Sequence, residues 1–224
     1  MSGRLLAIGD IHGCYCSLNT MVEEQLKLKK EDILILLGDY IDRGPQSKEV
    51  LDYIIRLISD GYQIIPLLGN HEEMLLKALD DYKYFVGWHY NGGYTTLESF
   101  GVSEPNEIGD GYFKFLRQLK YCHMDGRRIF VHAGFNDELD NTFEDTTAML
   151  WSRNVQYSNP MLSKRTIIHG HSIISLDACQ RLVESDSSVI NIDTGCFMGE
   201  YSDTGYLTAI QFPEKLLFHV AYCR

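Results

Sequence analysis

The first 81 residues alternate short apolar runs with longer helical patterns, and this alternation limits the possible folds more than any other feature. The apolar runs cover residues 5–8, 33–37 and 63–68, and the helical patterns cover 17–28, 47–59 and 72–81. This β-α-β-α-β order predicts parallel strands joined by right-handed crossovers. A Gly-Asp or Gly-Asn pair follows each apolar run. Polar groups should therefore gather at the carboxyl ends of the strands, where open α/β sheets bind ligands.

The remainder of the chain has a different pattern. Residues 88–121 are helical and aromatic, and short β-rich runs follow at 128–131, 166–169, 189–192, 206–211 and 216–221. Because no long helices separate these runs, they predict a second, mixed sheet packed on the first. No interior linker of Pro, Gly or Ser interrupts the chain. We therefore expect an α/β fold in one catalytic domain spanning residues 1–224.

Composition excludes several classes of partner. The net charge of -11 opposes binding to a nucleic-acid polymer, and no apolar run approaches the roughly 18 residues of a membrane span. The first residues lack the features of a signal peptide, so a cytoplasmic location is expected. In a reducing compartment the six cysteines should be free thiols, and the spacing of Cys14 and Cys16 is too short for a zinc knuckle.

Five short motifs at the ends of predicted strands hold the candidate chemistry. They are Gly9-Asp10-Ile11-His12-Gly13, Gly38-Asp39-Tyr40-Ile41-Asp42-Arg43-Gly44, Gly69-Asn70-His71-Glu72, His132-Ala133-Gly134 and His169-Gly170-His171. Taken singly, each is ordinary, because an Asp beside a Gly usually marks a turn. Asp10 and His12 are two residues apart, so in extended backbone they point the same way and can share a metal ion.

The other motifs supply further ligand types. Asp39 follows the neighbouring strand and could bridge two cations, while Asn70 offers an amide oxygen. His132 and His171 each add an imidazole nitrogen. This mixture of oxygen and nitrogen ligands suits Mn, Fe or Zn.

In this order the motifs resemble the signature of the calcineurin-like metallophosphoesterases, and within them that of the phosphoprotein phosphatase family, over residues 9–171. The resemblance implies a four-layer α-β-β-α sandwich with two mixed sheets and a centre of two divalent ions, with Mn expected and Fe or Zn as alternatives. It implies that one metal is held by Asp10, His12 and Asp39, and the other by Asp39, Asn70, His132 and His171. A water activated between such cations would attack phosphorus in line.

The same resemblance assigns the groups on the substrate side. It makes His71 the general acid and Asp42 the carboxylate that orients it. Arg43, Arg153 and Asn70 would contact the phosphate, although Arg153 could instead stack on an aromatic ring as a structural pair. The implied enzyme is a serine/threonine protein phosphatase that acts on phosphoproteins or phosphopeptides and releases inorganic phosphate.

Two other functions remain open. Symmetrical bis(5'-nucleosyl)-tetraphosphate hydrolases resemble the chain in size, in its opening motif and in Asp193-Thr194-Gly195-Cys196, but typically lack the acidic residue found here at Asp42. A non-catalytic metal-binding regulatory module would need neither Arg43 nor His71. The aromatic run at 82–90 predicts packing of a cap helix that could border the substrate cleft. Asp193 and Cys196 follow a predicted strand and could hydrogen-bond to a metal ligand, but a plain turn explains them as well, so both stay unassigned.

Overall fold

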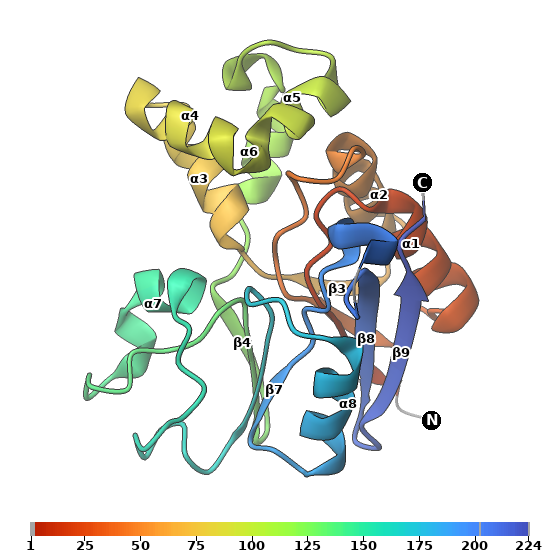
Figure 1. Ribbon diagram of the computed structural model, residues 1–224, viewed down its shortest axis with the longest axis vertical. Coiled ribbons are helices and arrows are strands. Elements are labelled where there is room, and N and C mark those ends of the chain that lie inside the picture. The colour runs from red at the N-terminus through yellow and green to blue at the C-terminus, as the bar shows by residue number, and fades with distance from the viewer. Residues whose placement is uncertain (1–2, 202, 224) are drawn as a thin grey trace.

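The computed structural model describes residues 3–201 and 203–223, and its strands form two sheets (Figure 1). The strands are β1 (Leu5–Ile8), β2 (Ile33–Leu36), β3 (Gln63–Pro66), β4 (Cys122–Asp125), β5 (Arg128–Val131), β6 (Thr166–His169), β7 (Val189–Asn191), β8 (Tyr206–Phe212) and β9 (Leu216–Ala221). The α-helices are α1 (Tyr15–Thr20), α2 (Ser47–Ser59), α3 (Asn70–Ala78), α4 (Tyr82–Trp88), α5 (Tyr94–Phe100), α6 (Asp110–Leu116), α7 (Thr146–Trp151) and α8 (Leu176–Glu184).

The five-stranded sheet has the order β3-β2-β1-β8-β9. The predicted parallel pairing of β1, β2 and β3 is confirmed, with Leu5 opposite Ile33 and Ile33 opposite Gln63. The prediction that all later strands form the second sheet is wrong for β8 and β9. β8 instead runs antiparallel along the open side of β1, with Phe212 opposite Leu5, and β9 pairs with β8. Local patterns identify a strand but not the sheet edge that it joins.

The four-stranded sheet has the order β4-β5-β6-β7. Its strands β5, β6 and β7 are parallel, whereas β4 is antiparallel to β5. β4 was not predicted, because its four residues Cys122–Asp125 include only two apolar side chains and the run is at the shortest length at which alternation indicates a strand. Both sheets thus contain parallel and antiparallel pairs, as expected of mixed sheets.

Alternating side chains divide the apolar core among the layers. Leu6 and Ile8 of β1 belong to the core on the helical side of the five-stranded sheet, together with residues of α1 and α2. Ala7 points the other way and packs in the core between the sheets, with Phe130 and Ile168. On the outer face of the second sheet, Ile129 packs with residues of α7 in a third core. This arrangement confirms the α-β-β-α sandwich.

Helices α3 to α6 form a lobe above the sheets in Figure 1. Within the aromatic run, Trp88 is completely buried, while Tyr82, Tyr84 and Tyr90 are exposed. Of the five rings in the run, Trp88 and the half-buried Phe85 therefore pack against the core, and three tyrosines lie on the surface.

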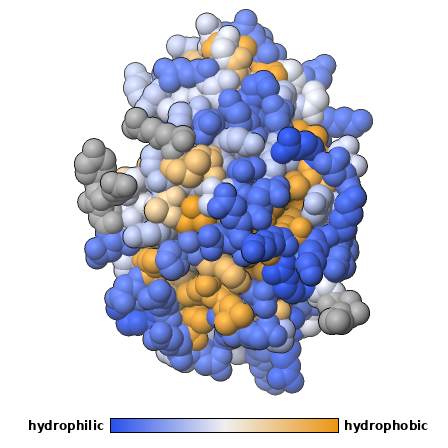
Figure 2. Space-filling model, turned by 90° about the vertical axis from the view of Figure 1, so that its right-hand side faces the viewer, coloured by the Kyte–Doolittle hydropathy of each residue, from blue (hydrophilic) through white to orange (hydrophobic). Residues whose placement is uncertain are grey.

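Cys16 and Cys223 form a disulfide, so the prediction of free thiols is wrong for this pair. The two cysteines are 207 residues apart, and the packing of β9 against α1 brings them together. The other four cysteines are free. Figure 2 looks onto the side that includes β9, where apolar side chains reach the surface in patches between hydrophilic ones. None of the helices in the described ranges is long and apolar enough to cross a membrane.

Candidate active site

The predicted site residues come together at the carboxyl ends of strands from both sheets. Asp10 and His12 follow β1, Asp39 follows β2, and Asn70 begins α3 after β3. His132 and His171 follow β5 and β6 of the other sheet. The packing of the two sheets against each other therefore brings together residues that are up to 161 positions apart. The hydrogen bond from the His171 backbone N–H to Asp10 Oδ2 is an example.

An unusual backbone conformation is concentrated here. Eight non-glycine residues of the described chain have a positive φ, and five of them are predicted site residues. These are His12 (46°), Asp39 (49°), Asp42 (69°), Arg43 (67°) and His171 (67°). Left-handed backbone costs side chains of this kind free energy and persists where the surroundings impose it, commonly at functional sites.

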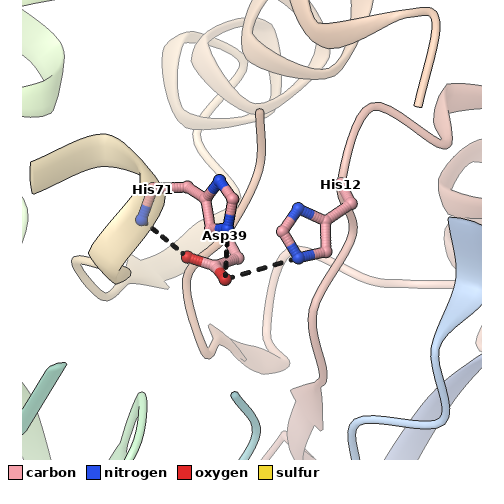
Figure 3. A group of neighbouring side chains, drawn as sticks. All are labelled: His12, Asp39 and His71. Atoms are coloured by element: carbon pink, nitrogen blue, oxygen red, sulfur yellow. Dashed lines mark hydrogen bonds and ion pairs between the residues drawn. The ribbon is translucent and has the colours of Figure 1, made fainter. Parts of the chain in front are cut away.

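Asp39 lies at the centre of the cluster, with His12 and His71 approaching it from two sides (Figure 3). Its Oδ2 is 3.4 Å from His12 Nε2 and 4.0 Å from His71 Nε2. Its Oδ1 is 3.5 Å from His132 Nε2 and also accepts a hydrogen bond from the backbone N–H of His71. Both oxygens of this one carboxylate thus face imidazole nitrogens, as a bridging ligand requires.

The tautomers of His12 and His132 fit a metal site. His12 Nδ1 is 2.9 Å from the carbonyl oxygen of Ile41, and His132 Nδ1 is 3.0 Å from that of Leu37. Burial lowers the pKa of both rings, that of His12 to about 3, so each is neutral and has one N–H. That N–H must donate to the carbonyl, which leaves a lone pair on each Nε2 facing Asp39. Such a pair of opposed lone pairs is favourable when a cation lies between them.

Two further side-chain atoms of the predicted ligands have no hydrogen-bond partner among the described residues. Asp10 Oδ1 and His171 Nε2 are both buried and make no hydrogen bond. Asn70 Oδ1 is approached by His132 Nε2 at 2.8 Å and by His171 Nδ1 at 3.0 Å, so it too faces the cluster. Ligand atoms of Asp39, His132 and His171 lie within 4.8 Å of one another. Because buried polar atoms are rarely left unpaired, this donor set fits divalent cations.

His71 has different surroundings from the three predicted ligand histidines. Ligand atoms of His12, Asp39 and His71 also lie within 4.8 Å of one another, so distance alone would admit it as a ligand. However, its Nδ1 is 2.7 Å from Asp42 Oδ2, and its Nε2 is 3.3 Å from Arg43 Nη2. A guanidinium beside Nε2 opposes a second cation there, so Asp10 is the better third ligand of that group. Burial lowers the pKa of His71, but Asp39 and Asp42 outweigh it and raise the pKa above its ordinary value.

A cavity of 110 Å³ opens over this cluster. Its walls include four of the six predicted ligands and both predicted phosphate-binding arginines, Arg43 and Arg153. Arg43 lies over the ring of Phe197, and Arg153 donates a hydrogen bond to Ser172, not to an aromatic partner. The cavity therefore presents two cations and a histidine to whatever binds above the ligand cluster.

Four residues outside the predicted site also line the cavity: Asp193, Asn91, Trp151 and Ile173. Asp193 is buried, and burial raises its pKa to about 7. The sequence left Asp193 unassigned, although its place after β7 matches that of the other site residues after their strands.

Glu72 is the second omission. It is completely buried, and its carboxylate accepts hydrogen bonds from four backbone N–H groups, those of Asp39, Tyr40, Ile41 and Gly69. The Glu72 side chain thereby links the loop after β2 to the loop after β3 through hydrogen bonds.

Comparisons with known proteins agree with this geometry. A family model of the calcineurin-like phosphoesterases matches residues 3–195. Serine/threonine-protein phosphatase 2 of Salmonella typhimurium is 29% identical, over 87% of this chain and 88% of its own length. The asymmetrical bis(5'-nucleosyl)-tetraphosphatase PrpE of a Geobacillus species is 28% identical, over 92% and 89%. A protein serine/threonine phosphatase from Saccharomyces cerevisiae shares the fold, with a TM-score of 0.68, 11% identity and coverage of 100% of this chain and 81% of that one.

Proposed function

Because the chain belongs to the calcineurin-like phosphoesterase family, we propose that it hydrolyses phosphate monoesters as a serine/threonine protein phosphatase with two divalent metal ions. Asp10, His12 and Asp39 would hold one ion, and Asp39, Asn70, His132 and His171 the other. Mn is the expected metal, and the oxygen and nitrogen donors also suit Fe or Zn. Bound there, two such ions supply hydroxide near neutral pH and offset the charge of the phosphoryl oxygens.

The protein's own groups orient the ester and complete the reaction. Arg43 and Arg153, on the walls of one cavity, hold the phosphoryl oxygens through their planar forks of N–H donors. His71 gives its Nε2 proton to the departing oxygen, while its Nδ1–H stays hydrogen-bonded to Asp42. Arg43 Nη2 is 3.3 Å from that Nε2 and can only donate, so in this step Arg43 turns from His71 to the phosphoryl oxygens. Product phosphate is then left between the two arginines.

The His71–Asp42 contact of 2.7 Å is the observation that supports this choice of substrate. A serine or threonine alkoxide is a strong base and leaves only when it is protonated. The nucleotide released from a dinucleoside tetraphosphate is a much weaker base and needs less help. A buried imidazole paired with a carboxylate is therefore best matched to an alkyl phosphate. A non-catalytic metal module would have no use for this pair.

Hydrolysis of bis(5'-nucleosyl) tetraphosphates is the second candidate. It is supported by relatives of both types: an asymmetrical one is 28% identical, and a symmetrical one from Buchnera aphidicola is 29% identical over 73% of this chain and 56% of its own length. The two candidates share the ligand cluster and differ in the group that leaves.

Kinetics with both substrate types test the proposal. We expect the purified protein with added Mn to have a higher kcat/KM for phosphoserine or phosphothreonine peptides than for diadenosine tetraphosphate. The reverse order would favour the second candidate. An absence of turnover on p-nitrophenyl phosphate with Mn, Fe and Zn in turn would indicate the non-catalytic module.

A further inference from the structure

Asp42 is surrounded by hydrogen-bond donors from the helical lobe as well as by His71. The Asp42 carboxylate is completely buried. Its Oδ2 accepts from Trp88 Nε1 at 2.8 Å as well as facing His71 Nδ1, and its Oδ1 accepts from Thr96 Oγ1 at 2.6 Å. Trp88 ends α4 and Thr96 lies in α5, so two helices of the lobe above the sheets reach down to one carboxylate (Figure 1).

Thr96 holds both the main chain and the side chain of Asp42. Its hydroxyl oxygen also accepts a hydrogen bond from the Asp42 backbone N–H at 2.9 Å. Asp42 has a φ of 69°, a conformation that needs support from its surroundings. Ser47 Oγ accepts from the same N–H at 3.0 Å, so Thr96 and Ser47 together hold the main chain, and Thr96 also sets how the carboxylate is turned.

Trp88 is itself held in place. Its ring is completely buried, and a Cβ added to Gly93 would lie 2.5 Å from it, so the indole packs directly on the backbone at Gly93. The indole N–H is thus presented to Asp42 Oδ2 from a fixed direction. An acceptor that receives two donors on one oxygen and a third on the other has little freedom to rotate.

We infer that Trp88 and Thr96 are positioning residues for proton donation: they fix the Asp42 carboxylate so that it aims His71 Nε2 into the cavity. Neither residue lines that cavity, so both act through Asp42. This inference depends on the proposed role of His71 as the proton donor. It assigns a catalytic purpose to α4 and α5, which lie outside the five motifs.

The test compares two leaving groups in variants that change one hydrogen bond each. Trp88→Phe removes the N–H and keeps an aromatic ring, and Thr96→Val removes the hydroxyl with little change of shape. Thr96→Ser keeps the hydroxyl and serves as the rescue. Thr95→Val is the matched control, because the Thr95 hydroxyl is one position away and donates to Gly92 O instead of Asp42. His71→Asn is the reference for the proposed function.

Each variant is assayed with glycerol 2-phosphate, whose leaving alkoxide is strongly basic, and with p-nitrophenyl phosphate, whose leaving group is weakly basic. For Trp88→Phe and Thr96→Val we expect kcat on glycerol 2-phosphate to fall roughly ten- to hundredfold, with a loss under about threefold on p-nitrophenyl phosphate. Metal content per chain should stay at the wild-type value, Thr96→Ser should restore most of the rate, and Thr95→Val should show no dependence on the leaving group.

Equal losses on both substrates, or equal defects in Thr96→Val and Thr96→Ser, would overturn the inference. If His71→Asn itself showed no dependence on the leaving group, the proposed proton donor and the inference would fail together. If only His71→Asn showed that dependence, His71 would keep its role and Trp88 and Thr96 would lose theirs. Should Trp88→Phe fail to fold, the two Thr96 variants still decide the question.

Discussion

Replacing Glu72 by Gln tests whether one buried carboxylate holds the two metal-site loops together. One oxygen of Glu72 accepts from the N–H groups of Asp39 and Gly69 at 2.9 and 3.1 Å, and the other from those of Tyr40 and Ile41 at 2.8 and 3.3 Å. Burial and the nearby Asp39 raise the pKa of Glu72, and the N–H donors oppose that rise. In all four of these hydrogen bonds, an oxygen of the Glu72 side chain is nevertheless the acceptor.

The size of the effect follows from these contacts. A Gln side chain has the same shape but only one oxygen, so its NH₂ group must face two of the four N–H donors. Each buried N–H group left without an acceptor costs roughly 1–3 kcal/mol, so losing two hydrogen bonds lowers the free energy of unfolding by about 2–6 kcal/mol. In a chain of this size that corresponds to a fall in Tm of roughly 4–24 °C.

Thermal and urea unfolding of chelator-treated protein measure this loss without a contribution from bound metal. Glu98→Gln is the control, because Glu98 is exposed and its side chain has no hydrogen bond or ion pair in the part of the chain that the structure describes. A loss below about 1 kcal/mol for Glu72→Gln, or one no larger than that of Glu98→Gln, would show that this carboxylate does not hold the loops.

Asp39→Asn should lower metal content and turnover together, because both ions would share this group; two metals per chain with normal turnover would refute the bridging role. Arg153→Ala should raise KM for phosphate esters roughly tenfold and weaken inhibition by phosphate in parallel, and unchanged values would make Arg153 structural. The third change concerns Asp193 in chelator-treated protein. Because its folded pKa is raised from 3.8 to about 7, its contribution to stability is complete below about pH 4 and is lost as pH rises towards 7. Tm should therefore fall between about pH 4 and about pH 7, and Asp193→Asn should reduce that fall. A fall as steep as that of the wild type would show that Asp193 does not cause it.

The sequence predicts those parts of the fold that depend on local pattern. β1, β2 and β3 could be identified because each is a short apolar run that ends at a Gly-Asp or Gly-Asn pair, and parallel pairing follows from the helices between them. The pairing of β8 with β1 could not be predicted, since any unpaired sheet edge offers the same backbone groups. The Cys16–Cys223 disulfide was hidden for a related reason, because it depends on that pairing.

The candidate site divides in the same way. Its ligand residues are visible in sequence because their chemistry is rare and they follow strands directly. Trp88 and Thr96 are not visible, because an indole and a hydroxyl in amphipathic helices are usually packing and surface groups, and only the folded lobe directs them at Asp42. Glu72 lies inside a predicted motif, yet three of its four partners come from a loop more than 30 residues earlier.

The left-handed backbone at the site lowers the stability of the fold at residues that the proposed function needs. Asp42 and Arg43 are consecutive residues with φ near 70°, a conformation that glycine adopts without steric cost and other residues adopt at roughly 1–2 kcal/mol each. A search for thermostable variants alone would therefore favour glycine at Arg43, where the side chain is exposed and would give up only its contacts with Phe197 and His71. The same change would remove a group that we propose to bind phosphate. Directed evolution of this protein should accordingly select for turnover and heat resistance at once, because at this turn the two requirements favour different residues.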